Sequence, residues 1–305
     1  SHSHSHPQSR PSSPAKPCFN PGLDASQRDA IAFALQPERR VALIHGPPGT
    51  GKTTTVAELI RQAVHRHGMR VLVTAPSNVA VDNILERLTE DEDEDRSRGK
   101  ASSKQKSLRT VRLGHPARIK PSIIKHSLEA LVQSSDGTEV VRDVRNELES
   151  YLKVISRSAR SDAAAKNRKG QRTKVDKQAA YKEIKSLRKE VRVREEKVVQ
   201  DLIRSAHVVL ATTVGADNRV LNQITHPKEG NGGDKNKGFD LVIIDEAAQA
   251  LEASCWIPIL RGRKVVLAGD HCQLPPTIKS KDSRVVAGLG VTLFERLMTL
   301  YRSRA

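Results

Sequence analysis

The chain has 305 residues, enough for about two domains of average size. Its 52 Lys and Arg outnumber 35 Asp and Glu, and the net charge of +17 indicates a polyanionic partner, nucleic acid before an anionic membrane surface. No run of about 18 apolar residues is present to span a bilayer, and no secretory signal is recognisable at the start. Three scattered cysteines exclude a disulfide framework and a CxxC zinc site, so we expect a cytoplasmic or nuclear protein.

Residues 1–17 consist mainly of Ser, His, Pro and Arg, and almost nothing in them is apolar. Such a segment cannot offset the entropy of ordering, so we predict a disordered tail. The Ser-His repeat over residues 1–6 has imidazoles that could bind a metal, although the disordered tail is the favoured interpretation.

Short apolar runs predict the strands of a parallel sheet. Each run is uninterrupted and rich in β-branched residues, which is typical of strands buried on both faces. The runs cover residues 41–45, 71–75, 208–212, 241–244 and 265–268. Helical patterns lie between them, for example over 53–65 and 79–88. The alternation predicts an α/β fold with a doubly wound parallel sheet.

Two segments interrupt this alternation. Residues 90–107 begin with a run of acids and continue with Ser, Lys and Arg, which predicts a disordered loop. Residues 116–205 carry two apolar stripes at helical spacing, which predict an inserted antiparallel helical hairpin. We therefore divide the α/β domain into residues 18–115 and 206–305, on either side of this insertion. The stripes are Val141, Val144, Leu148, Leu152 and Ile155, then Ala180, Ile184, Leu187, Val191, Val198 and Leu202.

The predicted hairpin is strongly basic. Residues 153–197 hold 16 Lys or Arg and 6 Asp or Glu, so this segment carries +10 of the net charge of +17. Long exposed helices often carry charged faces with no partner other than water. The excess of one sign favours a surface that contacts phosphates.

Residues 46–53 read Gly-Pro-Pro-Gly-Thr-Gly-Lys-Thr and satisfy G-x-x-x-x-G-K-[ST] between a predicted strand and a predicted helix. This pattern predicts a phosphate-binding loop (P-loop) for ATP. We expect three of its glycines to adopt positive φ and turn backbone N–H groups toward the phosphates. Two prolines stiffen the loop, the lysine reaches the β- and γ-phosphates, and the threonine after it ligates Mg²⁺. The predicted nucleotide-binding residues are Gly46, Pro47, Pro48, Gly49, Thr50, Gly51, Lys52, Thr53 and Thr54.

Two further predicted strands end in polar residues that ATP chemistry needs. Asp245 and Glu246 follow an apolar run, and we expect Asp245 to hold Mg²⁺ and Glu246 to polarise the attacking water. Residues 269–276, Gly-Asp-His-Cys-Gln-Leu-Pro-Pro, follow another strand. There Asp270 and Gln273 are the expected contacts to the γ-phosphate.

Small hydroxyl and amide side chains follow the remaining predicted strands. Ser77 and Asn78 come after residues 71–75, and Thr212 and Thr213 end the run that starts at residue 208. Such groups suit contacts to a sugar–phosphate backbone that carry no sequence information.

Taken in order, residues 23–27, the P-loop, and residues 75–78, 245–249 and 269–276 resemble motifs Q, I, Ia, II and III of superfamily 1B helicases. The branch is the one that contains the nonsense-mediated-decay and immunoglobulin mu-binding helicases, and the resemblance covers about residues 18–297. It implies a RecA-like domain, ATP and Mg²⁺ as cofactors, and 5′ to 3′ translocation on single-stranded RNA or DNA with duplex unwinding.

The resemblance also implies roles for single residues. Gln27 reads the adenine edge, Lys52 and Thr53 hold phosphate and Mg²⁺, Asp245 and Glu246 catalyse, and Gln273 couples the γ-phosphate to nucleic acid. The backbone of the strand is contacted by Ser77, Asn78, Val79, Thr212 and Thr213. The basic hairpin corresponds to the family's insertion near the path of the strand.

The chain departs from the family because nothing after residue 276 resembles a second RecA-like domain with its arginine fingers, which are worth about 10³–10⁵ in rate in comparable enzymes. We expect the first RecA-like domain of a longer protein, or a truncated gene product, that alone hydrolyses ATP at or near background. The alternative is a non-hydrolysing ATP-binding clamp or scaffold. A small-molecule kinase or an AAA+ ATPase is disfavoured because neither a substrate lid nor a sensor arginine is recognisable.

We expect a monomer that binds single strands through their backbone. Aromatic residues make up only 3% of the chain, which argues against base stacking as the main contact. RNA and DNA both stay open as substrates, as does association with a ribonucleoprotein or the ribosome.

Overall fold

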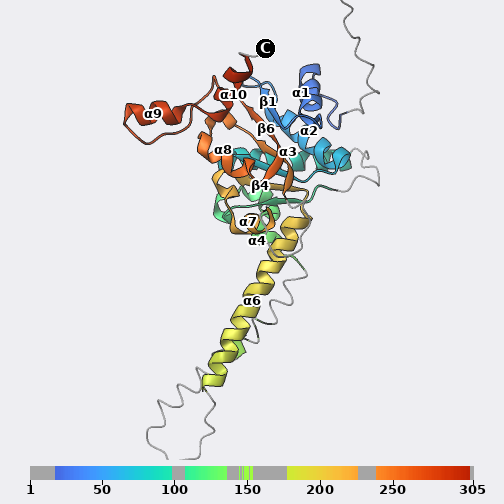
Figure 1. Ribbon diagram of the computed structural model, residues 1–305. Coiled ribbons are helices and arrows are strands. Elements are labelled where there is room, and N and C mark those ends of the chain that lie inside the picture. Colours follow the sequence, from blue (N-terminus) through green and yellow to red (C-terminus); the bar gives the residue numbers. More distant parts are fainter. Residues whose placement is uncertain are drawn as a thin grey trace, which may run out of the picture.

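The computed structural model describes residues 18–97, 107–135, 177–225 and 238–302, with a few isolated positions between 144 and 153 (Figure 1). Its centre is a six-stranded, all-parallel sheet with the order β1-β6-β5-β2-β4-β3. The predicted α/β class is therefore confirmed. The strands are β1 (Val41–His45), β2 (Val71–Ala75), β3 (Thr110–Arg112), β4 (Val208–Thr212), β5 (Phe239–Ile244) and β6 (Gly262–Gly269).

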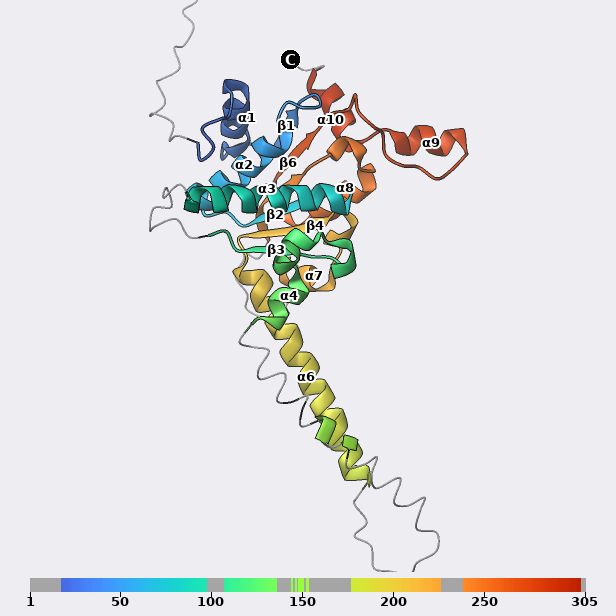
Figure 2. The ribbon, with the colours of Figure 1, turned by 180° about the vertical axis from the view of Figure 1, so that it is seen from behind.

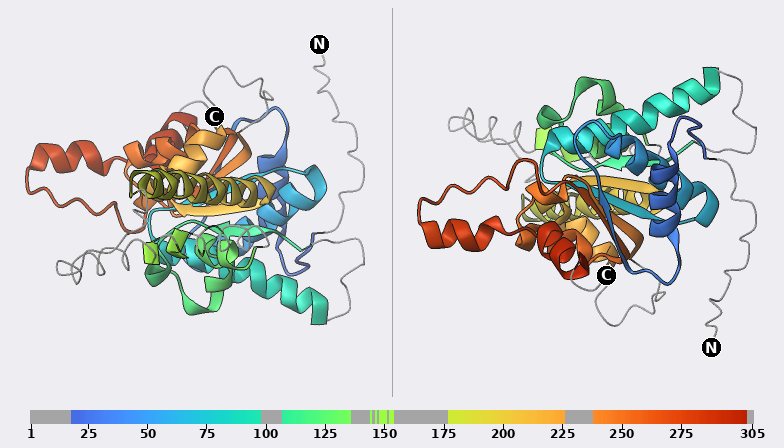
Figure 3. Two further views of the ribbon diagram at one scale, coloured as in Figure 1. Left: turned by 90° about the horizontal axis from the view of Figure 1, so that it is seen from below. Right: turned by 90° about the horizontal axis from the view of Figure 1, so that it is seen from above.

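Helices cover both faces of the sheet (Figure 3). One face carries α1 (Ala25–Leu35), α2 (Lys52–His67) and α3 (Asn78–Ser97). The other carries the end of α6 (Lys177–Ser205), α7 (Arg219–Thr225), α8 (Glu252–Ile259) and α10 (Leu293–Arg302). α9 (Ser283–Gly290) extends away from the sheet (Figure 1). Among the described helices, none has the length and the apolar content of a membrane span.

Alternate residues of each strand belong to two different hydrophobic clusters. Val71 and Val73 pack with α1, α2 and α3, whereas Leu72 between them packs with the helices of the other face. This period of two puts both faces of the central strands in apolar contact, which explains why their sequences read as uninterrupted apolar runs. The sheet is thereby fixed between its helices, and the polar residues that follow the strands lie at its edge.

The structure corrects the predicted loop over residues 90–107. α3 continues through Ser97, so the first part of that segment is helical. The helix is already nucleated by the buried residues Val81, Ile84 and Leu88, and adding further turns costs little once a helix has formed. An exposed pair between Arg87 and Glu90, 3.8 Å apart, spans the point where the acidic run begins. Residues 98–106 lie outside the described part.

The basic insertion is represented mainly by α6, which has 29 residues and a length of about 44 Å. Its last turns contact α4 (Leu128–Gln133) and α7, and the rest projects away from the sheet (Figure 2). Ile184 and Leu187 of the predicted stripe are buried, and so is Val144. Val141, Ile155 and the turn lie outside the described residues, so the antiparallel hairpin stays a prediction. The insertion begins differently from a helical arm, with the 3₁₀ turns Pro116–Arg118 and Pro121–His126 before α4.

A buried ion pair fastens the edge strand β3 to the rest of the domain. Arg112 is fully buried; its Nε donates to Asp82 Oδ1 of α3 at 2.9 Å, and its Nη2 donates to Asn78 Oδ1 at 2.9 Å. The second oxygen of Asp82 accepts from the backbone N–H of Lys120 at 3.1 Å. β3, α3 and the segment after β3 are thus held by one carboxylate.

We predict that Asp82→Ala destabilises the domain strongly, because it leaves the Arg112 guanidinium buried without a counter-charge. The free energy of unfolding should fall by about 3–5 kcal/mol, measured by urea denaturation. The control is Glu196→Ala on α6, which removes an exposed partner of Arg192 and should cost less than about 1 kcal/mol. Equal losses in the two variants would contradict the structural role given to Asp82.

Candidate nucleotide and nucleic-acid site

The residues predicted to handle ATP meet at one edge of the sheet, at the carboxyl ends of three neighbouring strands. β1 leads into the P-loop, β6 leads into Asp270 and Gln273, and β5 leads into Asp245 and Glu246. The parallel register aligns these ends, with His45 opposite Gly269 and Ile244 opposite Leu267. The strand of the γ-phosphate loop therefore lies between the P-loop strand and the strand of the acids, a common place for ligands in open α/β sheets.

The P-loop needs glycine at three positions, for two different reasons. Gly49 and Gly51 have φ values of 77° and 74°, a left-handed conformation that favours glycine. The expectation of a positive φ at Gly46 is wrong, because this residue is not among those with positive φ. Gly46 is needed for space instead: a Cβ there would come within 2.6 Å of Thr50 Oγ1 and 3.3 Å of Lys52 Cγ.

Lys52 is the first residue of α2, and its ammonium group closes the P-loop on itself. Nζ donates to the carbonyl oxygens of Gly46 at 2.6 Å and Pro47 at 3.0 Å. Thr50 Oγ1 also donates to Pro47 at 2.8 Å. No side chain caps the start of α2, so its first N–H groups are available to an anion. Thr53 and Thr54 lie half-buried in this first turn.

Gln27 contacts the P-loop from α1. Its Nε2 donates to the carbonyl oxygen of Thr50 at 2.9 Å, while its Oε1 accepts from the backbone N–H of Asp24 at 3.0 Å. Asp24 in turn accepts from the backbone N–H of Gln27, which completes a capping box at the start of α1. The D-x-x-Q pattern of residues 24–27 carries this signal, and it was not used above. Adenine recognition by Gln27 stays a prediction.

Asp245 is a buried carboxylate with a strongly perturbed acidity. Its side chain is nearly inaccessible, and burial, then the charge of Glu246, raises its pKa to about 6. The backbone N–H of Glu246, which donates to Asp245 Oδ1 at 2.9 Å, and the charge of Lys52 act in the opposite direction. A carboxylate in this position gains from a cation, so the residue fits the Mg²⁺ role expected of it.

Glu246 is the one non-glycine residue with positive φ in the described part of the chain, at 51°. Its Oε2 accepts from Gln249 Nε2 at 2.9 Å, which fixes the direction of the side chain. Left-handed backbone at a residue with a Cβ costs free energy and is often found at functional sites. The turn carries the Glu246 side chain out of the strand direction immediately after Asp245.

Asp270 and Gln273 are joined by a hydrogen bond, Gln273 Nε2 donating to Asp270 Oδ2 at 3.0 Å. The other oxygen of Asp270 accepts from the backbone N–H of Cys272 at 3.0 Å and lies 3.3 Å from His45 Nε2. These contacts, the Cys272 N–H first and then Gln273, lower the pKa of Asp270. Asp270 thus positions Gln273, and His45 is a member of this cluster that the sequence motifs did not indicate.

The residues expected to contact nucleic acid follow β2 and β4, the next two strands of the sheet. Ala75 and Thr212 are partners in the register, so the two groups lie side by side. Ser77 is exposed, and Val79 is 61% exposed. The hydroxyl of Thr212 accepts from the backbone N–H of Gly215 at 3.0 Å. The side chain of Thr213 is buried, so in this structure it does not line the surface.

The arrangement as a whole fits a nucleoside triphosphate and Mg²⁺. The P-loop presents a lysine and an uncapped helix start to an anion, and Asp245 presents a desolvated carboxylate to a cation. Thr53 and Asp245 are the residues that would hold Mg²⁺. Bound there, Mg²⁺ would neutralise charge on the phosphates.

We predict that Asp245→Asn stabilises the nucleotide-free chain at neutral pH. Because the folded-state pKa is raised to about 6, the folded chain binds this proton more tightly than the unfolded chain, and stability falls as pH rises from about 4 to about 6. Removing the charge should raise the free energy of unfolding by about 1–3 kcal/mol at pH 7.5 and change it little at pH 4. Thermal and urea unfolding in EDTA measure this.

The control for Asp245→Asn is Asp201→Asn, which removes one exposed charge from α6. It should change stability by less than about 0.5 kcal/mol at either pH. A destabilised Asp245→Asn chain at pH 7.5 would contradict the account of this carboxylate.

Comparison with known proteins places the chain among P-loop ATPases of the helicase type. A family profile described as "AAA domain" matches residues 22–281. "DNA-binding protein SMUBP-2" of Mesocricetus auratus is 44% identical over 92% of this chain and 24% of the relative. "DNA polymerase alpha-associated DNA helicase A" of Schizosaccharomyces pombe is 40% identical over 92% of this chain and 35% of the relative.

"Regulator of nonsense transcripts 1 homolog" of Drosophila melanogaster is 32% identical over 92% of this chain and 19% of the relative. The chain thus spans about a fifth to a third of the length of these relatives. The AAA name is shared with the AAA+ ATPases that the sequence pattern disfavours, while these relatives belong to the helicase branch indicated by the motifs. The chain belongs to the AAA domain family and, within it, to the superfamily 1B helicases, of which it represents the N-terminal RecA-like domain.

Proposed function

We propose that this chain is the ATP-binding part of an ATP-dependent helicase that hydrolyses ATP in response to single-stranded RNA or DNA. The observation that carries the proposal is the convergence of the P-loop, the acids Asp245 and Glu246, and Gln273 at the ends of three adjacent strands. The names of two relatives, a DNA-binding protein and a DNA helicase, agree with it.

In this proposal the residues of the site divide the chemistry among themselves. Lys52 gives up its bonds to the loop carbonyls and donates to the phosphates instead, and Thr53 and Asp245 hold Mg²⁺. Glu246 accepts a proton from the attacking water, aimed by its bond to Gln249. Gln27 leaves the Thr50 carbonyl to read the adenine. A low-dielectric site makes each of these contacts stronger than it would be in water.

Gln273 links the nucleotide to the nucleic acid in this proposal. Its strand, β6, lies beside β5, and β5 lies beside β2, whose end carries Ser77, Asn78 and Val79. A change at the γ-phosphate that moves Gln273 therefore has only β5 between it and the surface expected to hold the strand. Thr212 lies one strand further.

The basic arm extends the nucleic-acid surface. Exposed cations of α6 follow one another along a helix that projects from the sheet on the side of β3 and β4 (Figure 2). They are Lys182, Lys185, Arg188, Lys189, Arg192 and Lys197. Contacts of this kind hold phosphates without reading bases, so binding should be tolerant of sequence and sensitive to salt.

We further propose that the protein acts as a monomer in the cytoplasm or the nucleus, with a ribonucleoprotein or the ribosome as a partner to be tested. The three cysteines are free thiols in the structure, which suits a reducing compartment.

The alternative function is an ATP-binding clamp that does not hydrolyse ATP. Glu246 separates the two, because a clamp has no use for a general base. Glu246→Gln in the polypeptide that carries both RecA-like domains should reduce ATP turnover at least about a hundredfold and leave the affinity for ATP within about threefold. Lys52→Ala should instead weaken binding of a fluorescent ATP analogue to this chain at least about tenfold, with Lys125→Ala as the control. Turnover that survives Glu246→Gln, or that ignores single strands, would favour the clamp.

A second prediction concerns the arm. Lys182→Glu, Lys185→Glu and Lys189→Glu together should weaken binding of single-stranded RNA and DNA at least about tenfold and flatten the salt dependence, since each lost phosphate contact reduces the slope. The matched control reverses Arg39, Arg40 and Arg263, which lie at the opposite, amino ends of β1 and β6. Fluorescence anisotropy at several salt concentrations measures both. Equal weakening by the two triple variants would mean that net charge alone governs binding.

A further inference from the structure

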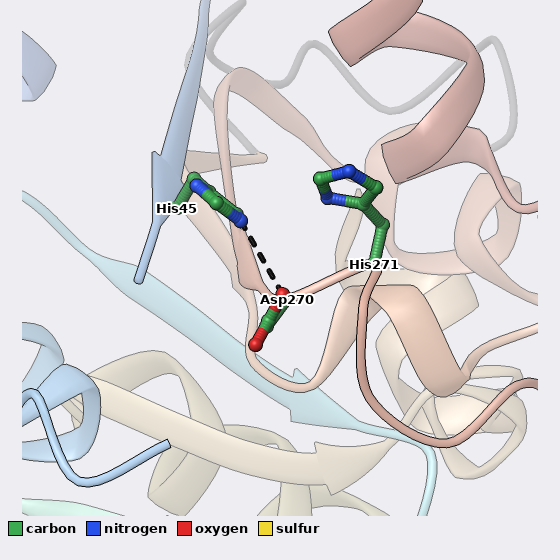
Figure 4. A group of neighbouring side chains, drawn as sticks. All are labelled: His45, Asp270 and His271. Atoms are coloured by element: carbon green, nitrogen blue, oxygen red, sulfur yellow. Dashed lines mark hydrogen bonds and ion pairs between the residues drawn. The ribbon is translucent and has the colours of Figure 1, made fainter. Parts of the chain in front are cut away.

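His45, Asp270 and His271 form a cluster that the ATP chemistry does not use. His45 ends β1 immediately before the P-loop, and the other two residues follow β6 (Figure 4). Their nitrogen and oxygen atoms that could serve as ligands all lie within 4.8 Å of one another. The ring centroids of the two histidines are 5.1 Å apart.

Part of the cluster already has the spacing of a coordination site. His45 Nε2 and Asp270 Oδ1 are 3.3 Å apart. Two ligand atoms on a tetrahedral zinc ion stand about 3.4 Å apart, because each bond is about 2.1 Å long. Asp270 is buried, and its carboxylate is held by the Cys272 N–H and by Gln273 Nε2. Fixing of a ligand by surrounding hydrogen bonds is common at metal sites.

His271 supplies a nitrogen that has nothing else to bind. Its Nδ1 is buried and has no hydrogen-bond partner among the described residues. Its Nε2 lies 3.7 Å from Cys272 Sγ. A proton on Nε2 directed at this sulfur leaves the lone pair of Nδ1 free. Figure 4 shows a ring nitrogen of His271 on the side that faces His45 and Asp270.

We propose that His45, Asp270 and His271 bind one divalent cation of the zinc class, at a site separate from the Mg²⁺ site of Asp245. Two imidazoles and one carboxylate favour Zn²⁺, Co²⁺ or Ni²⁺ over Mg²⁺, which prefers oxygen ligands. Three protein ligands leave a fourth position for water. The side chain of His271 needs only a small rotation, and it lies in a segment after β6 that has no regular secondary structure.

The site would connect two parts of the ATP machinery. His45 directly precedes Gly46, and His271 comes two residues before Gln273. A cation here therefore holds the start of the P-loop to the γ-phosphate loop, a consequence that rests on the proposed function, whereas the binding itself does not.

The test is a titration of the full chain with Co²⁺, followed by its visible absorption, in saturating Mg²⁺ and without nucleotide. Because His2, His4 and His6 in the tail also offer imidazoles, all three are first changed to Asn. We expect one equivalent of Co²⁺ to bind and Zn²⁺ to displace it. His45→Asn and His271→Asn, on different strands, should each weaken binding at least about tenfold.

Three controls complete the experiment. His67→Asn removes an exposed histidine at the end of α2 and should leave the affinity within about threefold. Asp245→Asn should do the same, which separates this site from the Mg²⁺ site. Thermal unfolding in EDTA establishes that each variant is folded, and Zn²⁺ should raise the midpoint of the parent chain and not of the two histidine variants. Absence of Co²⁺ binding in the parent chain, or binding that survives both substitutions, overturns the proposal.

Discussion

Parallel pairing of β1, β6, β5 and β2 is the constraint on which the rest of the structure depends. Because these strands run in one direction, the polar residues that follow each of them are delivered to one edge of the sheet. The apolar packing on both faces keeps the strands in register, so the distances between P-loop, acids and γ-phosphate loop are set by the core and not by the loops themselves. The buried carboxylate of Asp245 is the cost of this arrangement. It destabilises the empty domain and is relieved by a cation.

Hydrogen bonds inside the empty site occupy the groups that the proposed reaction requires. Lys52 is bonded to two carbonyl groups of its own loop, Gln27 to Thr50, and Gln273 to Asp270. Each donor must exchange its present acceptor for one on the ligand, and such an exchange costs less than burying an unpaired group would. The site is therefore preformed in its backbone, while its side chains change partners. This division agrees with a domain that binds and releases nucleotide repeatedly.

The sequence predicted the fold wherever local pattern and tertiary environment agree. Strands buried on both faces need apolar, β-branched residues throughout, so they could be recognised, whereas β3 has three residues, one of them the buried Arg112, and could not. Gly46 looked like a conformational glycine because the motif cannot distinguish φ from crowding. The helical course of residues 90–97 depends on a helix nucleated upstream. Contacts such as Arg112–Asp82 and His45–Asp270 join residues far apart in the chain, and no local pattern indicates them.

The contact between Arg112 and Asn78 limits what Asn78 can offer to a ligand. Its amide oxygen already accepts from the guanidinium, which leaves only the NH₂ group free. At this position the surface therefore acts solely as a donor and selects for lone pairs, which unesterified phosphate oxygens supply in every nucleotide. Arg112, buried behind the surface, thus confers a polarity on a residue that would otherwise tolerate either kind of group.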